Sequence, residues 1–190
     1  MKRNERNTAL LTALGIILGG GAAAVTTLAL RKRARRILES APAVVPHVDL
    51  TRYAGLWYEI ARYPNWFQPD DCYNTTATYS LLPDGTIEVL NQCREDGPEG
   101  EPDYARGIAR VADPETNAKL KVTFWWPFTG DYWIIDLGED YEYAVVSEPR
   151  RKYLWILSRT PELPQETYDA ILERLRAQGF DTDALVERRG

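Results

Sequence analysis

From residue 44 onward, the chain consists of short runs rich in Tyr, Trp, Val and Ile, separated by turn signals about every 8 to 16 residues. Turn segments such as Pro83-Asp84-Gly85 supply the fixed or positive φ that a tight reversal requires. This spacing predicts an antiparallel all-β sandwich or barrel built mainly from hairpins. The eight expected strands are residues 55–63, 73–81, 87–94, 104–111, 119–125, 131–137, 141–147 and 153–159.

The last segment of the chain changes to a helical period. Tyr168, Ile171 and Leu175 share one apolar stripe of a helix expected over residues 164–178, and Gly179 ends it. A single amphipathic helix has to pack on the outside of the sheet. We therefore expect an eight-stranded antiparallel up-and-down barrel with a C-terminal α-helix on its wall, and eight strands enclose room for one small ligand.

The N-terminal part has a different character. Residues 8–30 carry no charge and are flanked by basic residues, so as a helix of about 34 Å they are long enough to cross a bilayer core of about 30 Å. The alternative is a cleaved secretory signal, but five cations follow where such a signal prefers neutral residues. We expect residues 1–43 to be a hydrophobic helix and linker, and residues 44–190 to be the folded domain.

Charge separates along the same boundary. Residues 1–43 hold 8 Lys/Arg and 2 Asp/Glu, whereas residues 44–190 hold 15 Lys/Arg and 26 Asp/Glu. The acidic domain makes a nucleic-acid partner unexpected, because phosphate binding needs a cationic face. One His and two Cys exclude most metal sites, and no cofactor motif occurs. His47 lies in the linker, too remote to serve as a catalytic base, and we expect it at the surface.

Three ordered motifs carry a resemblance to a known family. Gly55-x-Trp57 lies at the start of the first expected strand, Asp140-Tyr141 opens the seventh, and Arg159 follows the eighth. Together they resemble the lipocalins, and within them the bacterial envelope lipocalins and apolipoprotein D. The resemblance implies that Arg159 closes the barrel floor against Trp57, and a guanidinium over an indole gains about 0.5–2 kcal/mol.

The same resemblance implies a ligand pocket inside the barrel. The positions that match the family's pocket are Tyr53, Tyr79, Asn91, Phe124, Tyr132, Tyr143 and Trp155. Strand parity supports several of them, since alternate residues of a barrel strand face inward. The alternative is that these rings fill a solid core, although such a core favours side chains without polar groups.

The two cysteines flank one expected hairpin. Cys72 and Cys93 lie at similar distances before and after Pro83-Asp84, so the hairpin brings them opposite one another, within the range that a disulfide tolerates. The bond would imply export, whereas two free thiols would fit a reducing cytosol. The positive-inside bias would keep the domain in the cytoplasm, so the cysteines and the basic cluster disagree on orientation.

We expect a lipocalin without catalysis that stores or transports a fatty acid, lysophospholipid or similar lipid in the cell envelope, in membrane maintenance or a stress response. The barrel is expected to be extracytoplasmic and anchored by the N-terminal helix, or secreted after signal cleavage. Trp125 and Trp126, in an aromatic hairpin tip, are expected to touch the bilayer or gate the barrel. The alternatives are a lipocalin-fold isomerase or de-epoxidase and a filled structural barrel. The sequence leaves the ligand and the oligomeric state open.

Overall fold

The computed structural model describes residues 30–33, 40–68 and 71–188. The chain divides into two compact units, Met1–Ser40 and Ala41–Gly190. In the first unit residues 30–33 are helical. The expected hydrophobic helix of residues 8–30 lies outside the described residues except for Leu30. Among the helices of the described ranges, none has the length and apolar character needed to cross a membrane.

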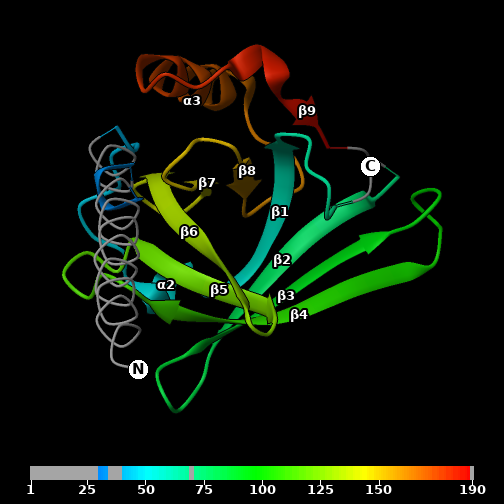
Figure 1. The fold of residues 1–190 in the computed structure, drawn as a ribbon. Coiled ribbons are helices and arrows are strands. Elements are labelled where there is room, and N and C mark those ends of the chain that lie inside the picture. The colour runs from blue at the N-terminus through cyan, green and yellow to red at the C-terminus, as the bar shows by residue number, and fades with distance from the viewer. Residues whose placement is uncertain (1–29, 34–39, 69–70, 189–190) are drawn as a thin grey trace, which may run out of the picture. The chain divides into compact units, whose positions relative to one another are not determined.

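The second unit is an eight-stranded antiparallel closed barrel with a C-terminal helix (Figure 1). Its strands are β1 (Gly55–Arg62), β2 (Tyr73–Leu81), β3 (Ile87–Arg94), β4 (Pro102–Val111), β5 (Lys119–Trp125), β6 (Phe128–Leu137), β7 (Tyr143–Ser147) and β8 (Leu154–Ser158). Each strand pairs with the next in sequence, and pairing of β1 with both β2 and β8 closes the barrel. Closure leaves none of these eight strands as a bare edge.

The up-and-down order sorts the connections between the two ends of the barrel. The β1–β2, β3–β4, β5–β6 and β7–β8 connections share one end, which we call the mouth. The short helix α2 (Leu50–Tyr53) lies before β1 at the other end, which we call the floor. Asp49 caps this helix by accepting hydrogen bonds from the backbone N–H groups of Thr51 and Arg52. Sequence analysis did not predict α2, because four residues are too few to show a helical period.

The C-terminal helix α3 (Gln165–Ala177) covers the outer wall of the barrel. Its buried Ile171 and Leu175 belong to a cluster that includes Ile135, Val145 and Ile156 from the outward faces of β6, β7 and β8. Gly179 follows the helix at φ +82°, a conformation that glycine adopts without a Cβ penalty. The expected helix is therefore present one residue shorter at each end.

Two further elements follow α3. The 3-10 helix η1 (Thr182–Ala184) leads to β9 (Val186–Glu187), which pairs antiparallel with Ala61 and Arg62 of β1, beyond the residues of β1 that pair with β2 (Figure 1). Sequence analysis did not predict this ninth strand. Two residues paired at the end of β1 carry no alternation that could identify them.

Candidate functional site

The barrel floor is held by Arg159 and Trp57. The Arg159 guanidinium carbon lies 3.8 Å from the centroid of the Trp57 ring, and Trp57 is fully buried. Arg159 also donates hydrogen bonds to the backbone carbonyls of Leu56 (2.9 Å) and Arg52 (2.6 Å), so it ties α2 to β1. Gly55 adopts φ +99°, and a Cβ there would lie 3.3 Å from Arg159 Nη1. The backbone conformation therefore favours glycine at this position, and a larger residue would also crowd Arg159.

The other residues of the expected motifs lie around this floor. Tyr141 is buried, and its hydroxyl accepts a hydrogen bond from the backbone N–H of Asp49 at 2.8 Å. Asp140 is exposed and lies 3.9 Å from Arg52. Tyr141 was expected to open the seventh strand, but that strand begins at Tyr143 because Tyr141 occupies a turn at φ +63°. Asp140 and Tyr141 therefore lie at the floor, before the start of β7.

Above the floor, three tyrosine hydroxyls meet inside the barrel. The Tyr132 hydroxyl lies 2.7 Å from that of Tyr53 and 2.8 Å from that of Tyr79. Burial raises the pKa of Tyr79 to about 12, partly offset by its hydrogen bond with Tyr132. The pKa values of Tyr53 and Tyr132 are also raised, well above 10.0. Burial is the larger cause, and the charge of a neighbouring tyrosine is the second. At neutral pH the interior therefore holds neutral hydroxyls.

This cluster predicts a loss of stability in alkali. The unfolded chain releases the tyrosine protons near pH 10, whereas the folded chain keeps them to higher pH. The contribution of these tyrosines to the free energy of unfolding is therefore fully present below pH 10. Above pH 10 it falls by about 1.4 kcal/mol per pH unit for each such tyrosine. Denaturation series at rising pH should give a shallower decline for Tyr132→Phe than for Tyr104→Phe, which alters an exposed ring. Equal slopes in the two variants would contradict the placement of the cluster.

The inner wall changes from buried to partly exposed toward the mouth. On β3 the inward Ile87 and Val89 are 4% and 3% exposed, whereas Asn91, nearer the mouth, is only half-buried. On β5 Leu120 is 3% exposed, whereas Phe124 is half-buried. The same change runs from Ile134 to Tyr132 on β6 and from Leu157 to Trp155 on β8. The inward side chains are therefore tightly packed at the floor and keep solvent access toward the mouth.

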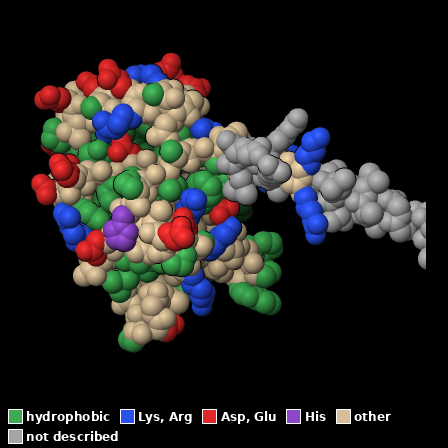
Figure 2. Space-filling model, turned by 90° about the vertical axis from the view of Figure 1, so that its left-hand side faces the viewer, with side chains coloured by type: hydrophobic (Ala, Val, Ile, Leu, Met, Phe, Trp, Pro, Cys, Tyr) green, Lys and Arg blue, Asp and Glu red, His purple; other side chains and the backbone are tan. Residues whose placement is uncertain are grey.

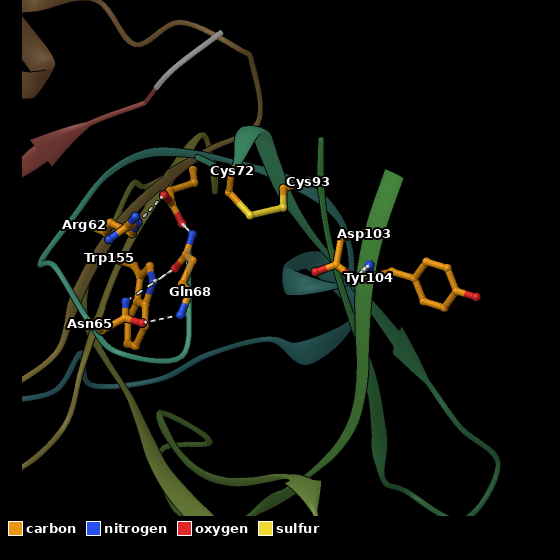
Figure 3. The surroundings of a disulfide bond; sticks show 9 residues. Arg62, Asn65, Gln68, Cys72, Cys93, Asp103, Tyr104 and Trp155 are labelled. Carbon is orange, nitrogen blue, oxygen red and sulfur yellow. Dashed lines mark hydrogen bonds and ion pairs between the residues drawn. A yellow bond between two sulfur atoms is a disulfide. The ribbon is translucent and has the colours of Figure 1, made fainter. Parts of the chain in front are cut away.

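The β1–β2 connection folds over part of this mouth. Gln68 donates from Nε2 to Glu59 Oε2 at 2.7 Å and accepts from Trp155 Nε1 at 3.3 Å. Figure 3 shows Gln68, Trp155 and Asn65 gathered beside Arg62. The Phe67 ring packs edge-on against Tyr153, with 5.3 Å between the ring centroids. A polar bridge and a ring contact therefore hold this connection across the mouth.

Glu59 is a buried carboxylate on the inner face of β1, two residues after Trp57. Burial raises its pKa, while the hydrogen bond from Gln68 and the charge of Arg62 act in the opposite direction. Arg62 Nε lies 3.3 Å from Glu59 Oε1. Sequence analysis missed Glu59 and Gln68 as site residues. Strand parity with Trp57 could have identified Glu59, but the irregular connection gave no signal for Gln68.

The expected disulfide between Cys72 and Cys93 is confirmed. The two sulfurs are bonded, and the Cα atoms are 5.4 Å apart. Figure 3 shows the bond between the polar group of Gln68 and Arg62 on one side and Asp103 and Tyr104 on the other. It joins the residue before β2 to the next-to-last residue of β3, so it fixes the mouth end of this hairpin.

Of the seven expected ligand contacts, Tyr143 is placed wrongly. Its ring lies on the outer wall under α3, where the hydroxyl accepts a hydrogen bond from Arg174 Nη2 at 2.9 Å. Ala144 and Val146 are the inward residues of β7. Tyr53, Tyr79, Asn91, Phe124, Tyr132 and Trp155 do lie on or beneath the inner wall. The structure thus brings six of the seven residues together.

Other candidate chemistry is sparse among the described residues. His47 is exposed, as expected, and lies on the face shown in Figure 2 among acidic and basic side chains. Within residues 30–33, 40–68 and 71–188, no three His, Cys, Asp or Glu side chains are grouped to hold a metal ion. The chemistry available to the site is therefore apolar burial with a few hydrogen-bonding groups.

The chain is similar to proteins of one family. A family model described as "Lipocalin-like domain" matches residues 48–189. The chain is 44% identical to temperature-induced lipocalin-1 of Arabidopsis thaliana over 150 residues, covering 75% of this chain and 79% of that protein. It is 40% identical to the outer membrane lipoprotein Blc of Escherichia coli K12 (75% and 80% covered) and 36% identical to mouse apolipoprotein D (76% and 78% covered).

Solved structures show the same fold at lower identity. Insecticyanin from the tobacco hornworm Manduca sexta superposes with a TM-score of 0.62 at 22% identity, covering 79% of this chain and 84% of that one. Lobster apocrustacyanin A1 superposes with a TM-score of 0.58 at 17% identity, covering 78% and 89%.

Proposed function

The chain belongs to the lipocalin family, and from this premise we propose that its barrel binds a small lipophilic molecule through the mouth, without catalysis. The observation that carries the proposal is the gradient of burial along the inner wall. Asn91, Phe124 and Trp155 keep partial exposure although they face into a closed barrel. A ligand that covers these side chains gains about 0.8 kcal/mol for each buried methylene.

The chemistry of the site favours a lipid-like ligand. The lower wall is aliphatic and aromatic, and its tyrosine hydroxyls already bond one another, so it suits an acyl chain. Polar groups gather at the mouth, where Glu59, Gln68 and Trp155 are within reach of a headgroup. The proposed ligand is a fatty acid, a lysophospholipid or a similar lipid with its chain toward the floor and its polar end at the mouth.

We further propose storage or transport of this lipid in the cell envelope, with Trp125 and Trp126 touching the membrane during transfer. Support comes from the similarity to Blc, named an outer membrane lipoprotein, and from the Cys72–Cys93 bond, which suits an oxidising compartment. Anchoring by an N-terminal helix remains a proposal that rests on the uncharged residues 8–30.

A matched pair of substitutions tests whether the ligand occupies the barrel. Asn91 faces inward and the adjacent Gln92 faces outward on β3. We expect Asn91→Trp to weaken binding of a fluorescent fatty-acid probe at least about tenfold, because the added ring fills space that the ligand needs. Gln92→Trp should leave probe binding unchanged. A probe that binds both variants as it binds the original chain would contradict a site inside the barrel.

Native purification followed by mass spectrometry of the extracted ligand tests its class. We expect a lipid that is recovered chemically unchanged after incubation with the protein. Conversion of the ligand would favour the alternative of a lipocalin-fold isomerase or de-epoxidase. Among the described residues, Glu59 is the one buried carboxylate, and Gln68 and Arg62 already contact it. This arrangement provides no second buried acid with which to share proton transfer.

A further inference from the structure

We infer that the outer wall of β4 and β5, together with the β5–β6 tip, docks on an anionic phospholipid bilayer, with Arg110 at the lipid phosphates. This inference deepens the proposed lipid transfer and rests on it. The docking surface consists of the aromatic tip (Trp125, Trp126 and Phe128) and the basic wall (Arg106, Arg110 and Lys121). On this surface Arg110 selects an anionic membrane for the aromatic tip.

The aromatic tip projects into solvent. Trp125, Trp126 and Phe128 are 65%, 89% and 78% exposed, and Trp125 pairs with Phe128 across the hairpin. Hydrophobic side chains also protrude at one edge of the face shown in Figure 2. Large exposed rings side by side mark an interaction surface, and Trp is favoured at the boundary between water and lipid. Because the tip belongs to the mouth end, docking would bring the open end of the barrel to the membrane.

A solvent-open recess joins the tip to the basic wall. It has a volume of about 430 Å³ and is lined by Arg106, Gly107, Ile108, Arg110, Thr123, Phe124 and Trp126. A Cβ on Gly107 would lie 2.9 Å from the Phe124 ring, so glycine lets that ring lie against β4. Guanidinium groups and an indole thus line one recess, which suits a phosphate group with an adjoining apolar segment.

One cation of the basic wall, Arg110, has no salt bridge with a described residue. Arg110 and Lys121 are direct cross-strand partners, and like charges in that position repel one another. Lys121 is paired with Asp131 and Arg106 with Glu88, each at 2.6 Å. Arg110 is exposed and forms no salt bridge with a described residue, although its charge contributes to the lowered pKa of Asp84. An anion beside Arg110 would therefore relieve the repulsion.

The favoured occupant is a bilayer because of how the charge is distributed. Residues 44–190 carry 15 Lys/Arg against 26 Asp/Glu, so an anionic membrane repels most of the domain surface. Arg110, the cation of the basic wall without a salt bridge, would attract anionic lipid beside the protruding aromatic tip and so offset that repulsion there. Anionic lipids would thereby set which end of the barrel faces the membrane.

The test uses the full chain reconstituted with vesicles that carry brominated acyl chains, which quench nearby tryptophans. The Trp125→Phe/Trp126→Phe variant keeps the other four of the six Trp. The difference in quenching between the original chain and this variant is therefore the quenching due to the tip. We expect tip quenching to be stronger with phosphatidylcholine plus phosphatidylglycerol than with phosphatidylcholine alone, and to weaken at high salt. Arg110→Gln should lower the docked-to-undocked ratio about fivefold with the anionic vesicles, whereas Arg110→Lys should preserve it.

Arg176→Gln is the matched control, because Arg176 is an exposed arginine on α3, over a different wall. Equal tip quenching with both lipid compositions would overturn the inference, and so would equal losses in Arg110→Gln and Arg176→Gln. Binding of the fatty-acid probe is measured without vesicles in the same variants. If docking fails while probe binding is intact, only the docking surface is refuted. If probe binding fails while docking is intact, the ligand site inside the barrel is refuted.

Discussion

Replacing Trp57 by Ala is expected to lower the free energy of unfolding by about 3–5 kcal/mol, which is the usual loss when a large aromatic core residue is truncated. The indole is fully buried, carries the Arg159 guanidinium on its face, and donates from Nε1 to the Tyr53 carbonyl at 2.8 Å. Its removal leaves a cavity at the floor and a half-buried cation without its ring. Chemical denaturation followed by circular dichroism measures the loss.

The matched control is Trp126→Ala, which removes the same side chain from a position that is 89% exposed. We expect that change to stay within about 0.5 kcal/mol. Arg159→Lys tests the other half of the pair. It retains the charge but loses the planar guanidinium that reaches the carbonyls of Leu56 and Arg52 together. Similar losses in Trp57→Ala and Trp126→Ala would show that the floor contact does not anchor the barrel.

Removing the disulfide is expected to cost about 3 kcal/mol, because the Cys72–Cys93 bond closes a loop of 21 residues in sequence separation and so restricts the unfolded chain. Denaturation of the original chain with and without a reductant measures this difference. The Cys72→Ala/Cys93→Ala variant should match the reduced chain and should not respond to reductant. If oxidised and reduced chains unfold at the same denaturant concentration, the bond contributes nothing to stability.

The strands of the barrel were largely predictable because their flanking turns and alternation are local properties. The expected residues 73–81, 87–94 and 119–125 coincide with β2, β3 and β5. β6 begins three residues earlier than expected, because pairing of Trp125 with Phe128 extends the hairpin to its tip. Strand ends depend on the partner strand and are less visible in the sequence than strand centres.

The assignment of Tyr143 failed for a structural reason. All five residues of β7 are buried, since the barrel interior covers one face of the strand and α3 covers the other. A strand buried on both faces has no alternation of polar and apolar residues, so its sequence does not show which residues face inward. The register shift between Ile134 and Asp136 on the neighbouring β6 adds to the ambiguity.

The sequence by itself determined the eight strands, the outer helix, the family motifs and the hairpin that opposes Cys72 and Cys93, because periodicity, turn residues and short loops act over neighbouring positions. Only the tertiary structure decided that Tyr143 faces α3, that Gln68 bridges Glu59 and Trp155, and that Arg110 and Trp126 line one recess. These arrangements depend on register shifts, an irregular connection and the side of the wall that each strand presents. Such features arise from packing between segments, and no single segment encodes them.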